Sequence, residues 1–178
     1  AVARRAKAEG GIATCPRNRT AANRFWESST HVKPIPQDQW GPEERYLVQR
    51  YGDNVVGLLK YGSMAFGVPH RHSVHDFWVI VRDLHAFHAA NADFYRTRLN
   101  VVSSVEDQIA ANRIAPNFYA LEENGLRMKL AVLSEHDFAR LCKAKMMFVK
   151  GRMQKPLRAI RITAAVQHGI DAARIEGA

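Results

Sequence analysis

The chain has 178 residues, of which 47% are hydrophobic and 24% are charged, so it is long enough for one domain with a buried core. This composition argues against a disordered chain or a collagen-like fibre, and two cysteines outside any CxxC pair exclude a zinc ribbon and a dithiol redox motif. The 26 basic and 17 acidic side chains give a net charge of +9, which favours an anionic partner: nucleic acid, a phospholipid surface or a phosphorylated substrate.

Residues 1–40 are expected to form an irregular basic arm, because Gly and Pro interrupt them and no period of 2 or 3.6 persists. The first 25 residues hold six basic side chains and one acid, a bias found in organellar leader sequences and equally in solvated arms. The ordered domain is predicted to begin near residue 41, since Pro42 followed by Glu43 and Glu44 is typical of a helix start. This helix should end at Gly52.

Strands and helices alternate irregularly after this helix, which favours an α+β or α/β fold. The apolar and β-branched runs predict strands at residues 54–61, 74–81, 117–121 and 126–133. The last two should form a hairpin, because Asn-Gly is a strong turn signal. Helical spacing and caps predict helices at residues 84–95, 105–111, 134–148 and 157–175. The stretches 62–73 and 151–156 are expected to be a turn-rich loop and a break after a helix.

The most informative stretch is a Gly-Ser turn followed, thirteen residues after the serine, by an acid on an apolar strand. A turn at Gly62-Ser63 lets backbone N–H groups and a hydroxyl approach a triphosphate. A carboxylate at Asp76 on the neighbouring strand would hold Mg²⁺ against the same phosphates. The alternative is an ordinary turn beside an exposed strand acid. This arrangement resembles the nucleotidyltransferases of the polymerase-β superfamily, although Trp78 stands where such sites usually have a second acid.

A second stretch, residues 150–156, contains three cations within six residues. Lys150, Arg152 and Lys155 together suit a phosphate clamp, although a solvated basic loop has the same composition. The wider segment 140–161 has no acid and eight basic side chains: Arg140, Lys143, Lys145, Lys150, Arg152, Lys155, Arg158 and Arg161. This patch fits a lipid-headgroup surface, and it also fits RNA or a large anionic assembly.

Taken together, these motifs resemble the mitochondrial phosphatidate cytidylyltransferases, the peripheral CDP-diacylglycerol synthases also described as translocator assembly and maintenance proteins. The motifs that carry the resemblance occur in the family's order: Gly62-Ser63, the acid and strand of residues 76–81, Asp83, Phe87, His88 and Asn91, the strand of residues 129–134, and the run 151–156. The resemblance implies a polymerase-β-type core, a mixed sheet flanked by helices, within residues 41–160. Residues 161–178 would then begin a further helical region that is truncated here.

The resemblance also implies a reaction, in which phosphatidate attacks the α-phosphate of CTP to give CDP-diacylglycerol, a cardiolipin precursor, and pyrophosphate. It implies that Gly62 and Ser63 cradle the triphosphate and that Asp76 is the catalytic Mg²⁺ ligand. Lys129 and the pair Arg152 and Lys155 would neutralise phosphates. The implied location is the mitochondrial matrix, peripheral to the inner membrane and in contact with its anionic surface.

Several alternatives stay open at this point. Asp83, Glu122 and Glu123 are candidates for a further acid. The histidines near the turn and on the next helix (His70, His72, His75, His85 and His88) are loosely spaced for zinc, and phosphate contact, packing or solvent exposure are the other interpretations. A different class of function is a catalytically degenerate family member that serves as a structural subunit of a larger organellar assembly, with protein or RNA partners bound through the basic arm.

Overall fold

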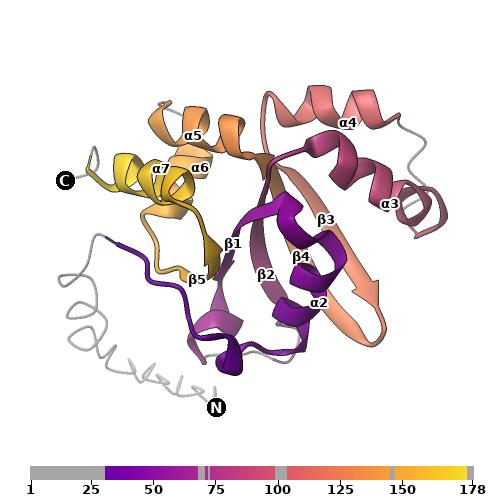
Figure 1. The fold of residues 1–178 in the computed structure, drawn as a ribbon, viewed down its shortest axis with the longest axis horizontal. Coiled ribbons are helices and arrows are strands. Elements are labelled where there is room, and N and C mark those ends of the chain that lie inside the picture. Colours follow the sequence, from indigo (N-terminus) through magenta and orange to yellow (C-terminus); the bar gives the residue numbers. More distant parts are fainter. Residues whose placement is uncertain (1–30, 68–70, 72, 99–103, 145–146, 176–178) are drawn as a thin grey trace, which may run out of the picture.

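A five-stranded mixed sheet forms the centre of the molecule in a computed structural model, which describes residues 31–67, 71, 73–98, 104–144 and 147–175 (Figure 1). The strands lie in the order β3-β4-β2-β1-β5. Only β2 and β4 pair in parallel, and the other neighbours are antiparallel. The strands are β1 (Val55–Tyr61), β2 (His75–Val81), β3 (Asn117–Glu123), β4 (Leu126–Ser134) and β5 (Arg158–Ile162). The predicted α+β class is therefore confirmed.

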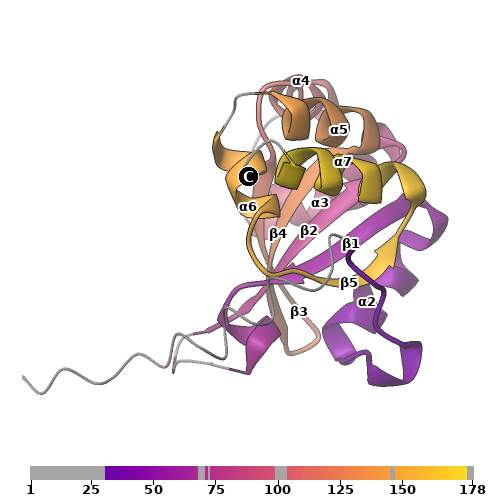
Figure 2. The ribbon, with the colours of Figure 1, turned by 90° about the vertical axis from the view of Figure 1, so that its left-hand side faces the viewer.

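Helices cover both faces of the sheet as two groups, which lie on the two sides of it in Figure 1, and Figure 2 views the molecule from the left-hand side of Figure 1. One group packs with the core side chains Leu58, Phe77 and Val79, and it comprises α2 (Pro42–Tyr51), α3 (Leu84–Arg98) and α4 (Val105–Asn112). The other packs with Leu59, Trp78 and Ile80, and it comprises α5 (Glu135–Lys143), α6 (Met147–Met153) and α7 (Ala164–Ile175). Because β2 is buried on both faces, it is apolar almost throughout.

Local sequence signals explain where most elements begin and end. Pro42 lies in the first turn of α2, and Gly52 ends that helix with a φ of 53°. Ser134 caps α5 by accepting from the Asp137 N–H, as the sequence indicated. Asn124 and Gly125 both have positive φ in the turn between β3 and β4, which confirms the predicted hairpin. Short 3-10 turns occur at Gln37–Gln39, Gly52–Asn54 and Ser63–Phe66.

The segment after β4 differs from expectation in two places. A single helix over 134–148 was expected, but α5 ends at Lys143, and α6 continues through Gly151, where a break had been predicted. A glycine inside a helix costs about 1 kcal/mol relative to alanine, and α6 forms in spite of this cost. A Cβ at Gly151 would meet nothing within 4 Å, so no close contact requires glycine at this position. A helix was also expected over 157–175, but its first part is strand β5, because the exposed edge of β1 offers these residues a hydrogen-bonding partner.

The described part of the N-terminal segment lies against β5. The Ile35 N–H donates to the Ala159 carbonyl over 2.8 Å, and the Val32 N–H donates to Gln167 of α7. Residues 31–40 contain only one 3-10 turn, and the rest of the predicted arm lies outside the described residues. The division of the chain at residue 160 stays a prediction. Among the described residues, no helix combines the length and the apolar character needed to cross a membrane.

Candidate phosphate-binding site

The turn that follows β1 places a glycine directly against the strand acid. Gly62 has a φ of 76°, which favours glycine, and a Cβ built on it would lie 2.6 Å from Asp76 Oδ2. Tyr61, the last residue of β1, pairs with Asp76 in the β1–β2 register. The sequence therefore needs glycine at position 62 both for the backbone conformation and for the close approach of the carboxylate.

Strand register places four residues in one row across the sheet, which we call the phosphate row: Tyr61, Asp76, Lys129 and Ala120. Asp76 on β2 pairs with Lys129 on β4, and Lys129 pairs with Ala120 on β3. Residues that are directly opposite in a sheet point to the same face. That face is the one covered by α5, α6 and α7, because Trp78, two residues beyond Asp76, belongs to the core beneath those helices.

Arg152 reaches this face from α6. Its guanidinium carbon lies 5.6 Å from the centre of the Tyr61 ring and 5.8 Å from that of the Phe148 ring. Both distances fit cation–π contacts, which hold the planar group beside the phosphate row. Burial raises the pKa of Asp76 above its ordinary value, while the charges of Lys129, Arg152 and His75 act in the opposite direction without cancelling it. The site thus combines a half-buried carboxyl with two nearby cations.

The remaining residues of the predicted site are less closely gathered. The Ser63 hydroxyl lies 3.0 Å from that of Ser73, so it bridges the two ends of the loop between β1 and β2. Lys155 is exposed in the loop after α6, where its N–H donates to the Arg152 carbonyl. The structure therefore brings Gly62, Asp76 and Arg152 together with Lys129, and it leaves Lys155 exposed in the loop after α6.

The three candidate acids occupy different places. Asp83 follows the far end of β2, where its backbone N–H and C=O bond to the side chain of Asn54 and its carboxylate accepts from the Ala86 N–H. Glu123 accepts from the Tyr46 hydroxyl and pairs with Arg50 of α2. Glu122 forms an ion pair with Arg127 over 3.7 Å. Both residues lie on the same face of the sheet as Lys129, because Arg127 is two residues before Lys129 on β4 and is the cross-strand partner of Glu122. The described residues contain no cluster of three His, Cys, Asp or Glu side chains arranged for a metal ion.

The helical motif of α3 is part of the core. His88 is buried, with Nε2 2.9 Å from Asn112 Oδ1 and Nδ1 3.2 Å from the Tyr95 hydroxyl. Asn91 accepts from the Tyr51 hydroxyl and thereby joins α3 to α2. These contacts favour the packing interpretation for His88.

The other histidines are dispersed. His75 lies on the opposite face of β2 from Asp76, with Nε2 3.6 Å from Glu43. His85 is exposed on α3. His70 and His72 lie outside the described residues.

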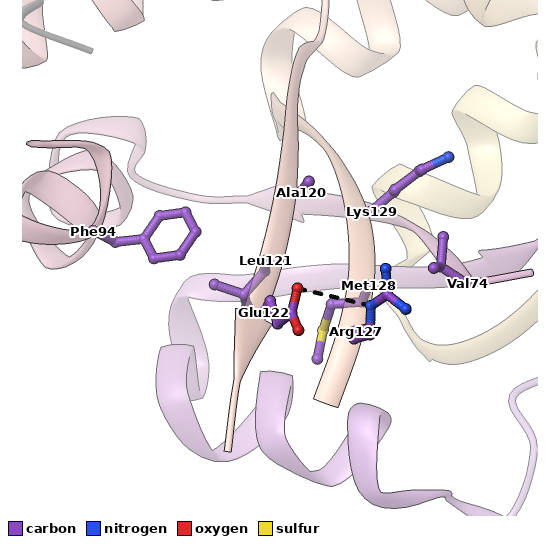
Figure 3. A pocket seen from close by; sticks show the side chains of 8 residues that line it. All are labelled: Val74, Phe94, Ala120, Leu121, Glu122, Arg127, Met128 and Lys129. Carbon is purple, nitrogen blue, oxygen red and sulfur yellow. Dashed lines mark ion pairs between the residues drawn. The ribbon is translucent and has the colours of Figure 1, made fainter. Parts of the chain in front are cut away.

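A hollow of about 310 Å³ adjoins the phosphate row beside β3 and β4 (Figure 3). Residues of both strands line it, and Figure 3 shows Phe94 of α3 on one side of the strands and Lys129 and Val74 on the other. Lys129 and Ala120 belong to both the row and the hollow. No sequence pattern predicted this hollow or the contact of Arg152 with the Tyr61 and Phe148 rings, because each depends on strand register and on the placement of α6.

The molecule is thus an α+β protein whose candidate site combines groups that nucleotidyl transfer requires: a close glycine turn, a strand carboxylate and converging cations. A family model described as phosphatidate cytidylyltransferase, mitochondrial, matches residues 45–175, and the chain belongs to this family. The match runs from α2 to the end of α7 and includes the whole phosphate row. This confirms the resemblance found in the sequence. A search of curated proteins found no match.

Proposed function

We propose that this chain transfers the cytidylyl group of CTP to phosphatidate, giving CDP-diacylglycerol and pyrophosphate. The observation that carries the proposal is the meeting of Gly62, Asp76 and Lys129 at one point of the sheet, within a family named for this activity. An oxygen of the phosphatidate phosphate forms a bond to the α-phosphorus of CTP. The bond to the oxygen that bridges to the β-phosphate breaks, and pyrophosphate leaves with that electron pair.

The attacking group needs little help from a general base. A phosphate monoester has a second pKa of about 6, so near neutral pH the attacking oxygen already carries a charge. The larger obstacle is electrostatic repulsion between the phosphate of phosphatidate and the triphosphate of CTP. Lys129 and Arg152 lie where they would offset this charge, and Arg adds a planar fork for two phosphate oxygens. Gly62 and Ser63 would cradle the triphosphate, with Lys155 at the edge of the site.

Asp76 is the residue that would hold Mg²⁺. The donor set fits an ion that enters with its nucleotide, because Mg²⁺ keeps several waters and uses one or two carboxylates plus substrate phosphates. The missing Cβ at Gly62 leaves room beside Asp76 Oδ2. When bound, the ion would neutralise charge on the phosphates in the transition state. In this scheme Asp76 must be ionised, and the neighbouring cations favour that form.

The proposed location is the mitochondrial matrix, at the anionic surface of the inner membrane. Part of the basic segment 140–161 is available for such a surface, since Lys143, Lys155 and Arg158 are exposed. Other members serve the fold: Arg161 donates to the carbonyls of Gly52 and Val55, and Arg140 donates to that of Arg113. The patch is therefore smaller than the sequence count indicates.

The test is a transfer assay with radiolabelled CTP, Mg²⁺ and phosphatidate vesicles, which measures CDP-diacylglycerol and pyrophosphate in equal amounts. Asp76→Asn should abolish both products. Asp93→Asn, the same change at an exposed carboxylate on α3, should leave the rate unchanged. Absence of product from the wild-type chain, with normal folding, would contradict the proposal. It would favour the second candidate, a structural subunit of an organellar assembly, for which the single carboxylate on the phosphate row is the supporting observation.

A further inference from the structure

Two exposed phenylalanines form a pair at the edge of the site. Phe118 of β3 is 55% exposed and Phe148 of α6 is 43% exposed, and their ring centres lie 5.5 Å apart at 88°. An aromatic pair of this kind, left open to water, is the sort of apolar surface that commonly marks a binding site. The rings belong to different elements, so the fold as a whole assembles the pair.

The pair lies next to the phosphate row. The adjacent row on the same face of the sheet consists of Leu59, Trp78, Ala131 and Phe118. Helix α6 covers the inner part of this row, where Phe148 approaches Trp78 with ring centres 6.4 Å apart. Phe118 lies at the outer end, on edge strand β3, so α6 does not cover it fully.

The two exposed rings are neighbours of the two cations of the site, Arg152 and Lys129. Arg152 lies 5.8 Å from the centre of the Phe148 ring. Lys129 and Phe118 are diagonal neighbours on β4 and β3, at the usual backbone spacing of about 7–8 Å. A molecule whose phosphate lies between Lys129 and Arg152 would therefore extend over the two rings if the part attached to its phosphate points toward β3.

The surroundings of the pair fit an apolar chain better than a nucleobase. On this face Phe118 has Ala120 as its neighbour along the strand and Ala131 as its cross-strand partner, and neither side chain offers a hydrogen bond to the edge of a base. The edge-to-face arrangement of the rings also leaves no parallel-sided slot for a flat heterocycle. Cations beside bare apolar rings instead match a lipid phosphate, whose headgroup is anionic and whose tail is apolar.

We infer that Phe118 and Phe148 bind the first segments of the acyl chains of the phosphatidate acceptor while Lys129 and Arg152 hold its phosphate. This inference rests on the proposed function for the identity of the acceptor. It assigns the acyl chains to the β3 side of the site and the nucleotide to the β1 side, where Gly62 lies.

The experiment measures binding by calorimetry with two probes, dioctanoyl phosphatidate below its micelle concentration and glycerol 3-phosphate, which lacks acyl chains. The variants are Phe118→Ser, Phe118→Leu and the control Ile175→Ser, which removes another exposed apolar side chain, on α7. Phe118→Ser should weaken binding of the dioctanoyl lipid about tenfold, because one apolar contact is lost. Phe118→Leu should keep most of the affinity, and Ile175→Ser all of it.

Equal affinities of the wild-type chain for the two probes, or equal effects of Phe118→Ser and Ile175→Ser, would overturn the inference. A loss of CTP affinity in Phe118→Ser that Phe118→Leu does not restore would also overturn it, because this result indicates stacking on a base. The transfer assay distinguishes the inference from the proposed reaction. Binding that depends on the acyl chains, without any product, would contradict the proposed reaction alone. Product formation with an unchanged KM for the lipid in Phe118→Ser would contradict the inference alone.

Discussion

Gly62 and Asp76 face each other so closely across β1 and β2 that only the absence of a side chain at position 62 leaves room for the carboxylate. Gly62→Ala should therefore displace Asp76 and strain a backbone with a φ of 76°. A displacement of 1 Å at a reacting group costs about 100-fold in rate, so we expect a fall of that order in kcat/KM for CTP.

Gly67→Ala is the matched control for this prediction. Gly67 has a φ of 70° in the same loop, but a Cβ there would meet nothing within 4 Å. The control should lower the melting temperature by a similar amount, because its backbone is strained in the same way. It should lose much less of the transfer rate. Equal kinetic losses in the two variants would show that backbone strain, and not the approach to Asp76, limits activity.

Asp76→Asn should separate stability from function. Burial raises the pKa of Asp76, so the folded chain disfavours the ionised form that predominates at pH 7. A raised folded-state pKa contributes stability at low pH that is lost as the pH rises through it. The neutral amide removes this loss, and we expect a melting temperature about 1–3 °C higher at pH 7.

The advantage of Asp76→Asn should disappear below the ordinary pKa of an aspartic acid, which differential scanning calorimetry at a series of pH values would reveal. Transfer activity should be lost at every pH. A variant that is less stable than wild type at pH 7 would show that Asp76 is held ionised by its cations.

Arg152→Lys should act as a severe change even though the charge is kept. Lysine cannot place a flat group between the Tyr61 and Phe148 rings or offer two parallel hydrogen bonds to a phosphate. We expect kcat/KM for phosphatidate to fall about tenfold or more, since charge-assisted hydrogen bonds are worth about 1.5–3 kcal/mol each. Arg158→Lys, an exposed change on β5, should leave the kinetics unchanged.

How far the sequence predicts this site depends on which residues are near one another in the chain. The turn at Gly62 and the strand acid Asp76 belong to one β-hairpin-like unit, so local signals were enough to connect them. Lys129 and Arg152 come from distant elements, and their place beside Asp76 follows from the parallel β2–β4 pairing and from α6. The family resemblance indicated both roles, and the run of cations around Arg152 supported one of them, whereas periodicity indicated neither.

The errors have a similar origin. The two basic residues of β5, Arg158 and Arg161, are three positions apart, a spacing that suits a helix, and pairing with β1 makes the segment a strand instead. The exposed pair of Phe118 and Phe148 was not predicted from the sequence, because it depends on the position of β3 at the edge of the sheet. Tertiary placement decided each of these cases.

Breaking the buried ion pair between Glu44 of α2 and Lys60 of β1 should lower the free energy of unfolding considerably. The two charges lie 2.6 Å apart, with 2% and 12% of their side chains exposed. Removal of one partner leaves the other buried and unpaired, so Lys60→Met should cost about 3–5 kcal/mol in the free energy of unfolding.

The double variant Lys60→Met with Glu44→Leu should recover most of this loss, because well-packed apolar pairs often replace buried ion pairs. Urea denaturation of the single and double variants measures the coupling. Additive losses in the double variant would show that the two charges do not depend on each other.

His88 should make the unfolding free energy fall as the pH drops. Asn112 Nδ2 donates to the Val132 carbonyl, so its Oδ1 faces His88 Nε2 as an acceptor, and the imidazole is neutral with its proton on Nε2. Burial lowers the pKa of His88 below 6.5, although the bond to Asn112 acts in the opposite direction. Below about pH 6.5 His88 is therefore protonated in the unfolded chain but still neutral in the folded chain. The free energy of unfolding falls as the pH decreases toward the folded-state pKa.

His88→Gln should remove this dependence. The variant is expected to be about 1–2 kcal/mol less stable than wild type at pH 8, because an amide fills the site imperfectly. The difference should shrink as the pH falls from 7 to 5. His85→Gln, a change at an exposed histidine on the same helix, should keep the wild-type slope. Denaturation curves at several pH values measure both slopes, and an unchanged slope in His88→Gln would assign the titration to another group.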